Sequence, residues 1–147
     1  MLNRAQIKLG WIGTGVMGKS MASHLMKAGY TNMRVFNRTA SKADDLVRQG
    51  AVFAKSPAEV AMEVDFLFLM LGYPHDVEKM VFEPEHGIMH HMNKGSSLID
   101  HTTSSPGLAE KIALSLEDQG VASIDAPVSG GDIGAKNGAL VTMVGGE

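Results

Sequence analysis

The segment that most constrains this chain is residues 7–18, where a short apolar run breaks at three glycines and continues as a helical pattern. Gly13 permits a tight turn at the end of a strand, and Gly15 lets the backbone approach a pyrophosphate. Gly18 lets the following helix pack closely on the sheet. The free N–H groups at the start of that helix favour phosphate. Glycines at this spacing also form plain tight turns, so the interpretation depends on the rest of the chain.

Apolar runs of strand length alternate with segments of helical period along the whole chain, which is typical of a parallel sheet covered by helices. The expected strands are residues 7–12, 33–36, 51–53, 64–71, 96–100, 121–125 and 139–144. The expected helices are residues 16–28, 41–49, 58–62, 76–81 and 106–119. We expect residues 126–138 to form a loop with one helical turn at most. The pattern predicts an α/β fold of the Rossmann type, a doubly wound and mostly parallel sheet in a single dinucleotide-binding domain over residues 1–147.

Composition excludes several classes of protein. The chain has 147 residues, no cysteine and a formal net charge of −3, so it has no disulfide framework and no thiolate metal site. This charge gives no reason to expect a nucleic acid or an anionic membrane as a partner. The longest apolar run, residues 66–71, is far shorter than the roughly 20 residues of a membrane span, and residues 1–6 lack the apolar core of a signal peptide. We expect a cytoplasmic protein.

The residues after the second expected strand indicate which nicotinamide nucleotide would bind. In a unit that prefers NAD, an acidic side chain at that point accepts a hydrogen bond from the ribose 2′-hydroxyl. This chain has Asn37, Arg38 and Thr39 there, and these side chains suit a 2′-phosphate instead. A charge-assisted bond to phosphate is worth roughly 1.5–3 kcal/mol, so Arg38 alone favours NADP over NAD by about tenfold to a hundredfold.

Further loops at the expected carboxyl ends of strands carry small or polar residues, and ligands of open α/β sheets bind at that edge. Residues 71–73 and 101–105 form two of these loops. A third contains Ser129, Gly130 and Gly131, whose hydroxyl and N–H groups suit a carboxylate, although a plain tight turn explains them equally well.

His86 and His90 have a spacing that allows metal binding on a helix. No carboxylate or outer-shell partner is evident beside them, and surface histidines are common. We therefore assign no metal site.

Three stretches together resemble the β-hydroxyacid dehydrogenase family, which includes 3-hydroxyisobutyrate dehydrogenase. They are Gly-Thr-Gly-Val-Met-Gly at residues 13–18, Asp-His-Thr-Thr-Ser-Ser-Pro at residues 100–106, and Asp-Ala-Pro-Val-Ser-Gly-Gly-Asp-Ile-Gly-Ala at residues 125–135 with Gly138 and Met-Val-Gly-Gly at residues 143–146. The resemblance covers the chain from Ile7 onward but only the cofactor-binding half of the family's length. The family's helical C-terminal domain is absent from this chain.

The resemblance implies a reversible hydride transfer between a nicotinamide and a short 3-hydroxy acid such as 3-hydroxyisobutyrate, in an enzyme that forms homo-oligomers. It places the substrate carboxylate at Ser129, Gly130 and Gly131. The expected cofactor-binding residues are Gly13, Gly15, Val16, Met17, Gly18, Asn37, Arg38, Thr39, Met70, Leu71 and Thr103. Among these, Thr103 would lie beside the nicotinamide.

The chain departs from the family in two respects. The family's proton-transfer lysine lies beyond Glu147, and Lys136 stands too early to replace it, so we expect cofactor binding with little or no turnover. His101 stands where the family usually has an apolar residue, either near the nicotinamide or as a histidine at the rim of the core. A glyoxylate or succinic semialdehyde reductase and a non-catalytic dinucleotide-binding module remain as alternatives.

Overall fold

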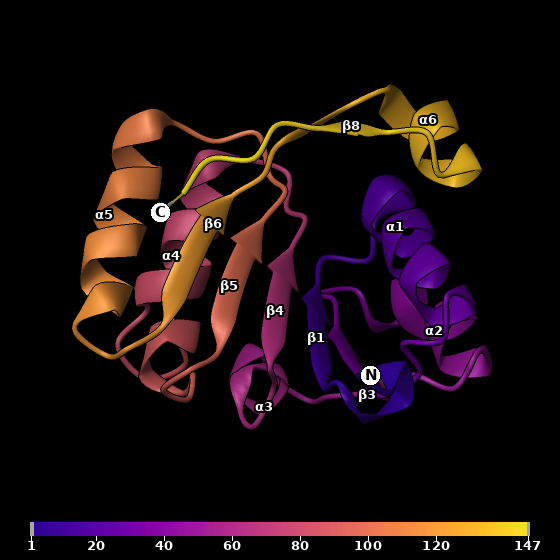
Figure 1. The fold of residues 1–147 in the computed structure, drawn as a ribbon, viewed down its shortest axis with the longest axis horizontal. Helices are drawn as coiled ribbons and strands as arrows, with labels where there is room; N and C mark the ends of the chain where they lie inside the picture. The colour runs from indigo at the N-terminus through magenta and orange to yellow at the C-terminus, as the bar shows by residue number, and fades with distance from the viewer. Residues whose placement is uncertain (1, 147) are drawn as a thin grey trace.

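The computed structural model describes residues 2–146 and has a six-stranded parallel sheet at its centre (Figure 1). Its strands are β1 (Leu9–Ile12), β2 (Met33–Phe36), β3 (Val52–Phe53), β4 (Phe66–Leu69), β5 (Ser97–Asp100) and β6 (Ala122–Asp125). They lie in the order β3-β2-β1-β4-β5-β6, so the winding direction reverses between β1 and β4. This topology confirms the predicted Rossmann-type fold.

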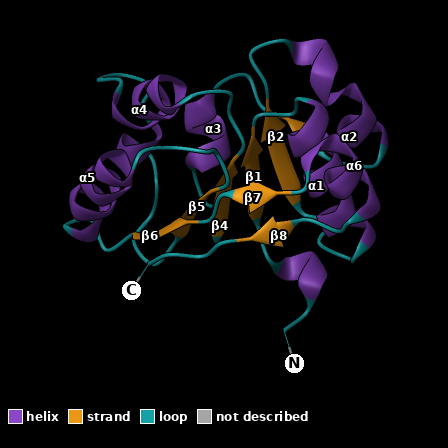
Figure 2. Cartoon of the chain, turned by 90° about the horizontal axis from the view of Figure 1, so that it is seen from above, coloured by secondary structure: helices purple, strands orange, loops and turns teal. Residues whose placement is uncertain are grey.

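Helices cover both faces of the sheet (Figure 2). The helices are α1 (Val16–Lys27), α2 (Asp44–Arg48), α3 (Pro57–Ala61), α4 (Pro74–Phe82) and α5 (Pro106–Glu117), with 3₁₀ turns at Arg4–Gln6, Ala40–Ala43 and Ile88–His90. Ser56 and Ser105 begin α3 and α5 by accepting hydrogen bonds from the third helical N–H, and each precedes a proline that suits the first turn. Among the described residues, no helix is long and apolar enough to cross a membrane.

Alternation of side chains along β1 divides the core into two layers. Trp11 packs with β2, α1 and α2 on one face, whereas the next residue, Ile12, packs with β4, β5, α3, α4 and α5 on the other. Both side chains are fully buried. A central strand buried on both faces needs this continuous apolar sequence.

The structure corrects two expectations in the last part of the chain. Residues 126–138 contain β7 (Val128–Ser129) and the two-turn helix α6 (Gly131–Asn137), not a loop with one turn at most. The expected strand over residues 139–144 is reduced to β8 (Val141–Thr142), which pairs antiparallel with β7 outside the main sheet.

The physical reason for the first error is the composition of α6. Its buried residues are Gly134 and Ala135, while its one large apolar side chain, Ile133, is exposed. The helix therefore has no apolar stripe for a periodicity argument to detect, and it is defined by its packing against α1. β4 is also shorter at both ends than the expected strand over residues 64–71, since it begins at Phe66 and residues 70–71 leave the sheet and line a cleft.

The turn from β1 into α1 depends on two close approaches of the backbone. A Cβ atom on Gly18 would lie 1.9 Å from the Gly13 carbonyl oxygen, and one on Gly13 would lie 2.1 Å from the Met70 carbonyl oxygen. Gly13 also has a φ of +98°, a conformation that favours glycine. Backbone atoms occupy both positions, so no side chain fits without moving a strand or the helix.

We expect Gly18→Ala to lower the free energy of unfolding by at least about 2 kcal/mol, because the added methyl overpacks against backbone. Gly107→Ala is the matched control, since Gly107 also lies in the first turn of a helix and a Cβ there meets no atom within 4 Å. The control should be neutral or stabilising by up to about 1 kcal/mol. Urea denaturation followed by circular dichroism measures both, and equal stabilities of the two variants would contradict this account.

Candidate dinucleotide site

A cleft of about 600 Å³ lies at the carboxyl edge of the sheet, where the strand order reverses. Ligands of doubly wound folds bind at this switch point, and the volume is in the range of small-molecule sites. The cleft is lined by seven of the predicted cofactor residues: Gly13, Gly15, Asn37, Arg38, Thr39, Met70 and Leu71. The sequence segments that supply them are far apart, and parallel strands bring their ends together.

The start of α1 borders the cleft at Gly15 and presents free backbone N–H groups. Gly15 precedes the helix without a side-chain cap, and the first turn of α1 contains no acidic residue. A Cβ on Gly15 would meet no atom within 4 Å, so the space in front of the helix is open. An uncapped, unneutralised helix start of this kind fits a pyrophosphate.

Asn37 has a role that the sequence did not reveal. Its Oδ1 atom accepts a hydrogen bond from the Thr14 N–H at 2.8 Å, and its Nδ2 atom donates to the Thr39 carbonyl oxygen at 2.9 Å. The amide thus joins the glycine loop to the loop after β2. With its polar groups engaged in these bonds, it positions Arg38 and Thr39, both of which are exposed at the cleft.

Basic residues outnumber acidic residues in the lining of the cleft. Lys42 from the 3₁₀ turn and Lys79 from α4 join Arg38 in the lining, with Asp76 and Glu83 as the acidic residues. Lys42 follows Arg38 by about one turn, so its position is readable from the sequence. Lys79 is brought to the cleft only by the packing of α4, which no local pattern signals. The three cations exceed the two carboxylates, which favours an anionic ligand.

A buried polar chain joins the loops after β4 and β5. The Thr102 N–H donates to the Asp100 Oδ1 atom at 2.9 Å, and the Thr102 hydroxyl oxygen accepts from the Leu71 N–H at 2.9 Å. Asp100 is 7% exposed. Burial raises its pKa to about 6, and the neighbouring carboxylate of Asp125 acts in the same direction. These two hydrogen bonds hold the backbone of Leu71 at the wall of the cleft.

His101 lies at the rim of the core rather than free in the cleft. Its ring stacks on Phe68 with centroids 5.8 Å apart and on Trp11 at 6.0 Å. The Nδ1 atom is 2.8 Å from the Ala126 carbonyl oxygen, which can only accept, so Nδ1 carries a hydrogen. Burial lowers the pKa of the imidazole. His101 therefore connects the end of β5 to the segment that leads to Ser129.

The remaining predicted residues lie outside the lining of this cleft. Gly18 is buried under the β1 turn, and Val16, Thr103 and Ser129 are exposed. Gly130 and Gly131 follow Ser129 with positive φ angles of 136° and 62°. Met17 is partly buried in the first turn of α1.

Two buried hydroxyls at this edge, Thr14 Oγ1 and Ser104 Oγ, have no hydrogen-bond partner among the described residues. Groups of this kind cost about 1–3 kcal/mol each when left unpaired.

No group of three or more His, Cys, Asp or Glu residues in the described part of the chain could hold a metal ion.

The fold, the glycine turn and the cleft at the switch point together define a dinucleotide-binding domain. Residues 8–147 match the family model described as the NAD binding domain of 6-phosphogluconate dehydrogenase, and the chain belongs to this family.

The most similar relatives include dehydrogenases of hydroxy acids. One relative is the probable 3-hydroxyisobutyrate dehydrogenase-like 1, mitochondrial, of Arabidopsis thaliana. It is 50% identical to this chain over 147 residues, which is 100% of this chain and 44% of the relative. The solved structure of Mycobacterium tuberculosis 3-hydroxyisobutyrate dehydrogenase with L-serine matches with a TM-score of 0.87 and 28% identity, over 96% of this chain and 47% of that one. The structure of Psf3 in complex with NADP+ and 2-OPP matches with a TM-score of 0.86 and 33% identity, over 95% of this chain and 49% of that one.

These comparisons confirm the resemblance to the β-hydroxyacid dehydrogenases. The chain spans about half the length of each of these relatives.

We expect the stability of Asp100→Asn relative to wild type to increase with pH. The raised pKa means that the native state keeps a proton that the unfolded chain releases, so wild-type stability falls as the pH rises from near 3.8 through about 6. Asparagine still accepts from Thr102 and carries no charge. The difference in unfolding free energy should therefore grow by about 2–3 kcal/mol between about pH 4 and about pH 8.

The matched control is Glu110→Gln, which neutralises an exposed carboxylate on α5. Its difference from wild type should stay within about 0.5 kcal/mol over the same range. Urea titrations at a series of pH values measure both variants. A flat difference for Asp100→Asn would show that the carboxyl is not held in its protonated form by burial.

Proposed function

We propose that residues 1–147 form one dinucleotide-binding domain that prefers NADP(H) and serves hydride transfer from a short 3-hydroxy acid to the nicotinamide, and in reverse from the nicotinamide to the corresponding carbonyl compound. The observation that carries the cofactor preference is the pair of basic residues that line the cleft after β2. Arg38 and Lys42 follow β2, and no acidic residue occupies positions 37–39. A dianionic 2′-phosphate is favoured by these charges, whereas an NAD-binding site uses an acid here. The complex of the related Psf3 contains NADP+, which agrees with the proposal.

The residues of this chain would hold the cofactor along the whole edge of the sheet. The N–H groups of Gly15, Val16 and Met17 would bind the pyrophosphate, and Arg38 with Thr39 would bind the 2′-phosphate. Met70 and Leu71 supply the apolar wall of the cleft, and Thr103 would lie towards the nicotinamide. The bound nicotinamide supplies the hydride acceptor or donor.

Ser129, Gly130 and Gly131 would hold the substrate carboxylate by a hydroxyl and two backbone N–H groups. This orients the hydroxyl-bearing carbon but does not remove the hydroxyl proton. That step needs a general base, worth about 10²–10⁴-fold in rate, and the resemblance assigns it to a lysine beyond residue 147. We therefore propose that the 147 residues bind cofactor and turn substrate over slowly or not at all.

Isothermal titration calorimetry with NADPH and NADH tests the cofactor preference. We expect NADPH to bind about tenfold to a hundredfold more tightly than NADH, and Arg38→Gln to remove most of that difference. Arg48→Gln is the matched control, because Arg48 is a guanidinium on α2 that pairs with Asp45 and lies outside the lining of the cleft. Tighter binding of NADH by the wild-type chain would overturn the proposal.

Ligand-observed NMR with 3-hydroxyisobutyrate, glyoxylate and succinic semialdehyde tests the substrate assignment. We expect 3-hydroxyisobutyrate to bind the NADP-loaded chain, and Ser129→Ala to weaken that binding by about fivefold to tenfold through loss of one hydrogen bond. Absorbance of the reduced nicotinamide should report little or no turnover. A stronger response to the aldehydes indicates the reductase alternative, and cofactor binding with no response to any acid indicates a non-catalytic module.

A further inference from the structure

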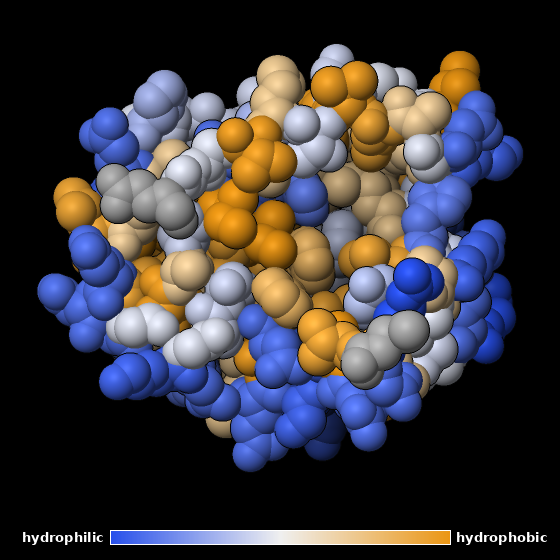
Figure 3. All heavy atoms as spheres, viewed as in Figure 1, coloured by the Kyte–Doolittle hydropathy of each residue, from blue (hydrophilic) through white to orange (hydrophobic). Residues whose placement is uncertain are grey.

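Residues 127–144 leave the main sheet after β6, cross its carboxyl edge to α1 and return; we call this segment the strap (Figure 1). Its base is fixed at Asp125, whose N–H and carbonyl oxygen both bond to Gly145, and at Ala126, which accepts from His101. The strap contains β7, α6 and β8, and Ser129 lies in β7. Its apolar residues Val141 and Val144 are exposed, and apolar side chains gather along this part of the surface (Figure 3).

A single side chain ties the far end of the strap to the rest of the molecule. The His24 Nε2 atom lies 2.9 Å from the Ala135 carbonyl oxygen and 3.0 Å from that of Lys136. Carbonyl oxygens only accept, so Nε2 donates to both. Within the described residues, these are the only two hydrogen bonds that join residues 127–144 to residues outside 125–145.

The His24 contact closes the last turn of α6. Ala135 and Lys136 lie in that turn, where helix carbonyls lack partners within the helix. Gly138 ends the helix with a φ of +65°, and its Cβ position would be 3.5 Å from the His24 ring. The Ala135 carbonyl oxygen also accepts from the Gly138 N–H at 3.3 Å, so the imidazole adds a second donor to Ala135, supplies the donor for Lys136 and packs under the turn that follows.

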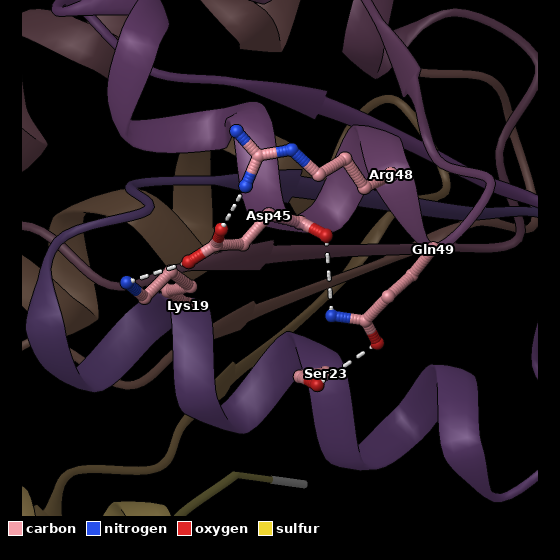
Figure 4. Close-up of polar contacts among 5 residues, drawn as sticks. All are labelled: Lys19, Ser23, Asp45, Arg48 and Gln49. Atoms are coloured by element: carbon pink, nitrogen blue, oxygen red, sulfur yellow. Dashed lines mark hydrogen bonds and ion pairs between the residues drawn. The ribbon is translucent and has the colours of Figure 1, made fainter.

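The surface on which α6 sits is firmly held. This surface belongs to α1. Lys19 of α1 pairs with Asp45 at 3.0 Å, and Ser23 of α1 donates to Gln49 at 3.0 Å (Figure 4). Asp45 also pairs with Arg48. In contrast, α6 buries only Gly134 and Ala135. With so little apolar area beneath it, α6 depends on the polar contact for its place.

We propose that His24 is a positioning residue that latches α6 to α1 and thereby fixes the position of the Ser129 loop, which would bind the substrate. The same helix α1 would bind the pyrophosphate at its N-terminus and hold the substrate loop through His24, two turns further on. This inference depends on the proposed function for its consequence in substrate binding. The latch itself is a property of the fold and can be measured without any ligand.

Hydrogen exchange measured by mass spectrometry on the full 147-residue chain tests the latch. We expect His24→Ala to raise the exchange rate of the α6 amides by about tenfold or more, because the variant lacks the N–H that holds the strap to α1 and the strap therefore opens more often. Exchange in β1 and β4 should be unchanged. His24→Gln, which keeps an N–H donor of similar reach, should restore part of the protection. Ser23→Ala is the matched control, since Ser23 bonds to Gln49 rather than to the strap. Unchanged exchange in His24→Ala would overturn the proposal.

Binding measurements on the same variants test the positioning role. His24→Ala should weaken binding of 3-hydroxyisobutyrate to the NADP-loaded chain by about fivefold or more while the Kd for NADPH changes by less than about twofold. Faster exchange with unchanged acid affinity would show a structural latch only and would overturn the positioning role. Absence of acid binding to wild type would overturn the proposed substrate and this role together, whereas the exchange experiment would still decide whether the latch exists.

Discussion

The close approach of α1 to β1 is the constraint on which the rest of the site depends. The position of a Gly18 Cβ is occupied by the Gly13 carbonyl oxygen, and that of a Gly13 Cβ by the Met70 carbonyl oxygen. The helix therefore starts directly over the end of the central strand, next to the end of β4. Its free N–H groups face the switch point because the backbone can come this close. Any side chain at these glycines would separate the helix start from the cleft.

A second layer of polar contacts converts this turn into a defined binding edge. Asn37 joins the glycine loop to the loop after β2, Thr102 joins the loops after β4 and β5, and His101 joins the end of β5 to Ala126. Each contact uses a side chain to satisfy a backbone group at the end of a strand. Loops that share hydrogen bonds in this way hold their positions relative to one another, which a ligand spanning several loops requires.

The sequence predicted the main sheet well because its strands are apolar on both faces and its helices carry clear signals. The helices expected at residues 58–62 and 106–119 are present as α3 and α5, each begun by a serine followed by proline, and residues of the glycine loop line the cleft. The end of the chain was predicted poorly. Gly134 and Ala135 of α6 have no apolar periodicity, and the pairing of β7 with β8 is set by the path of the strap rather than by alternation.

The sequence by itself determined the α/β class, the glycine turn and the identity of the side chains after β2, because these depend on residues that are neighbours in the chain. Only the tertiary structure decided that Lys79 faces the cleft, that Asp100 is buried enough to raise its pKa, and that His24 meets α6 more than 100 residues further on. Such contacts arise from the packing of whole elements. A local pattern of residue types carries no information about which distant backbone group a side chain will reach.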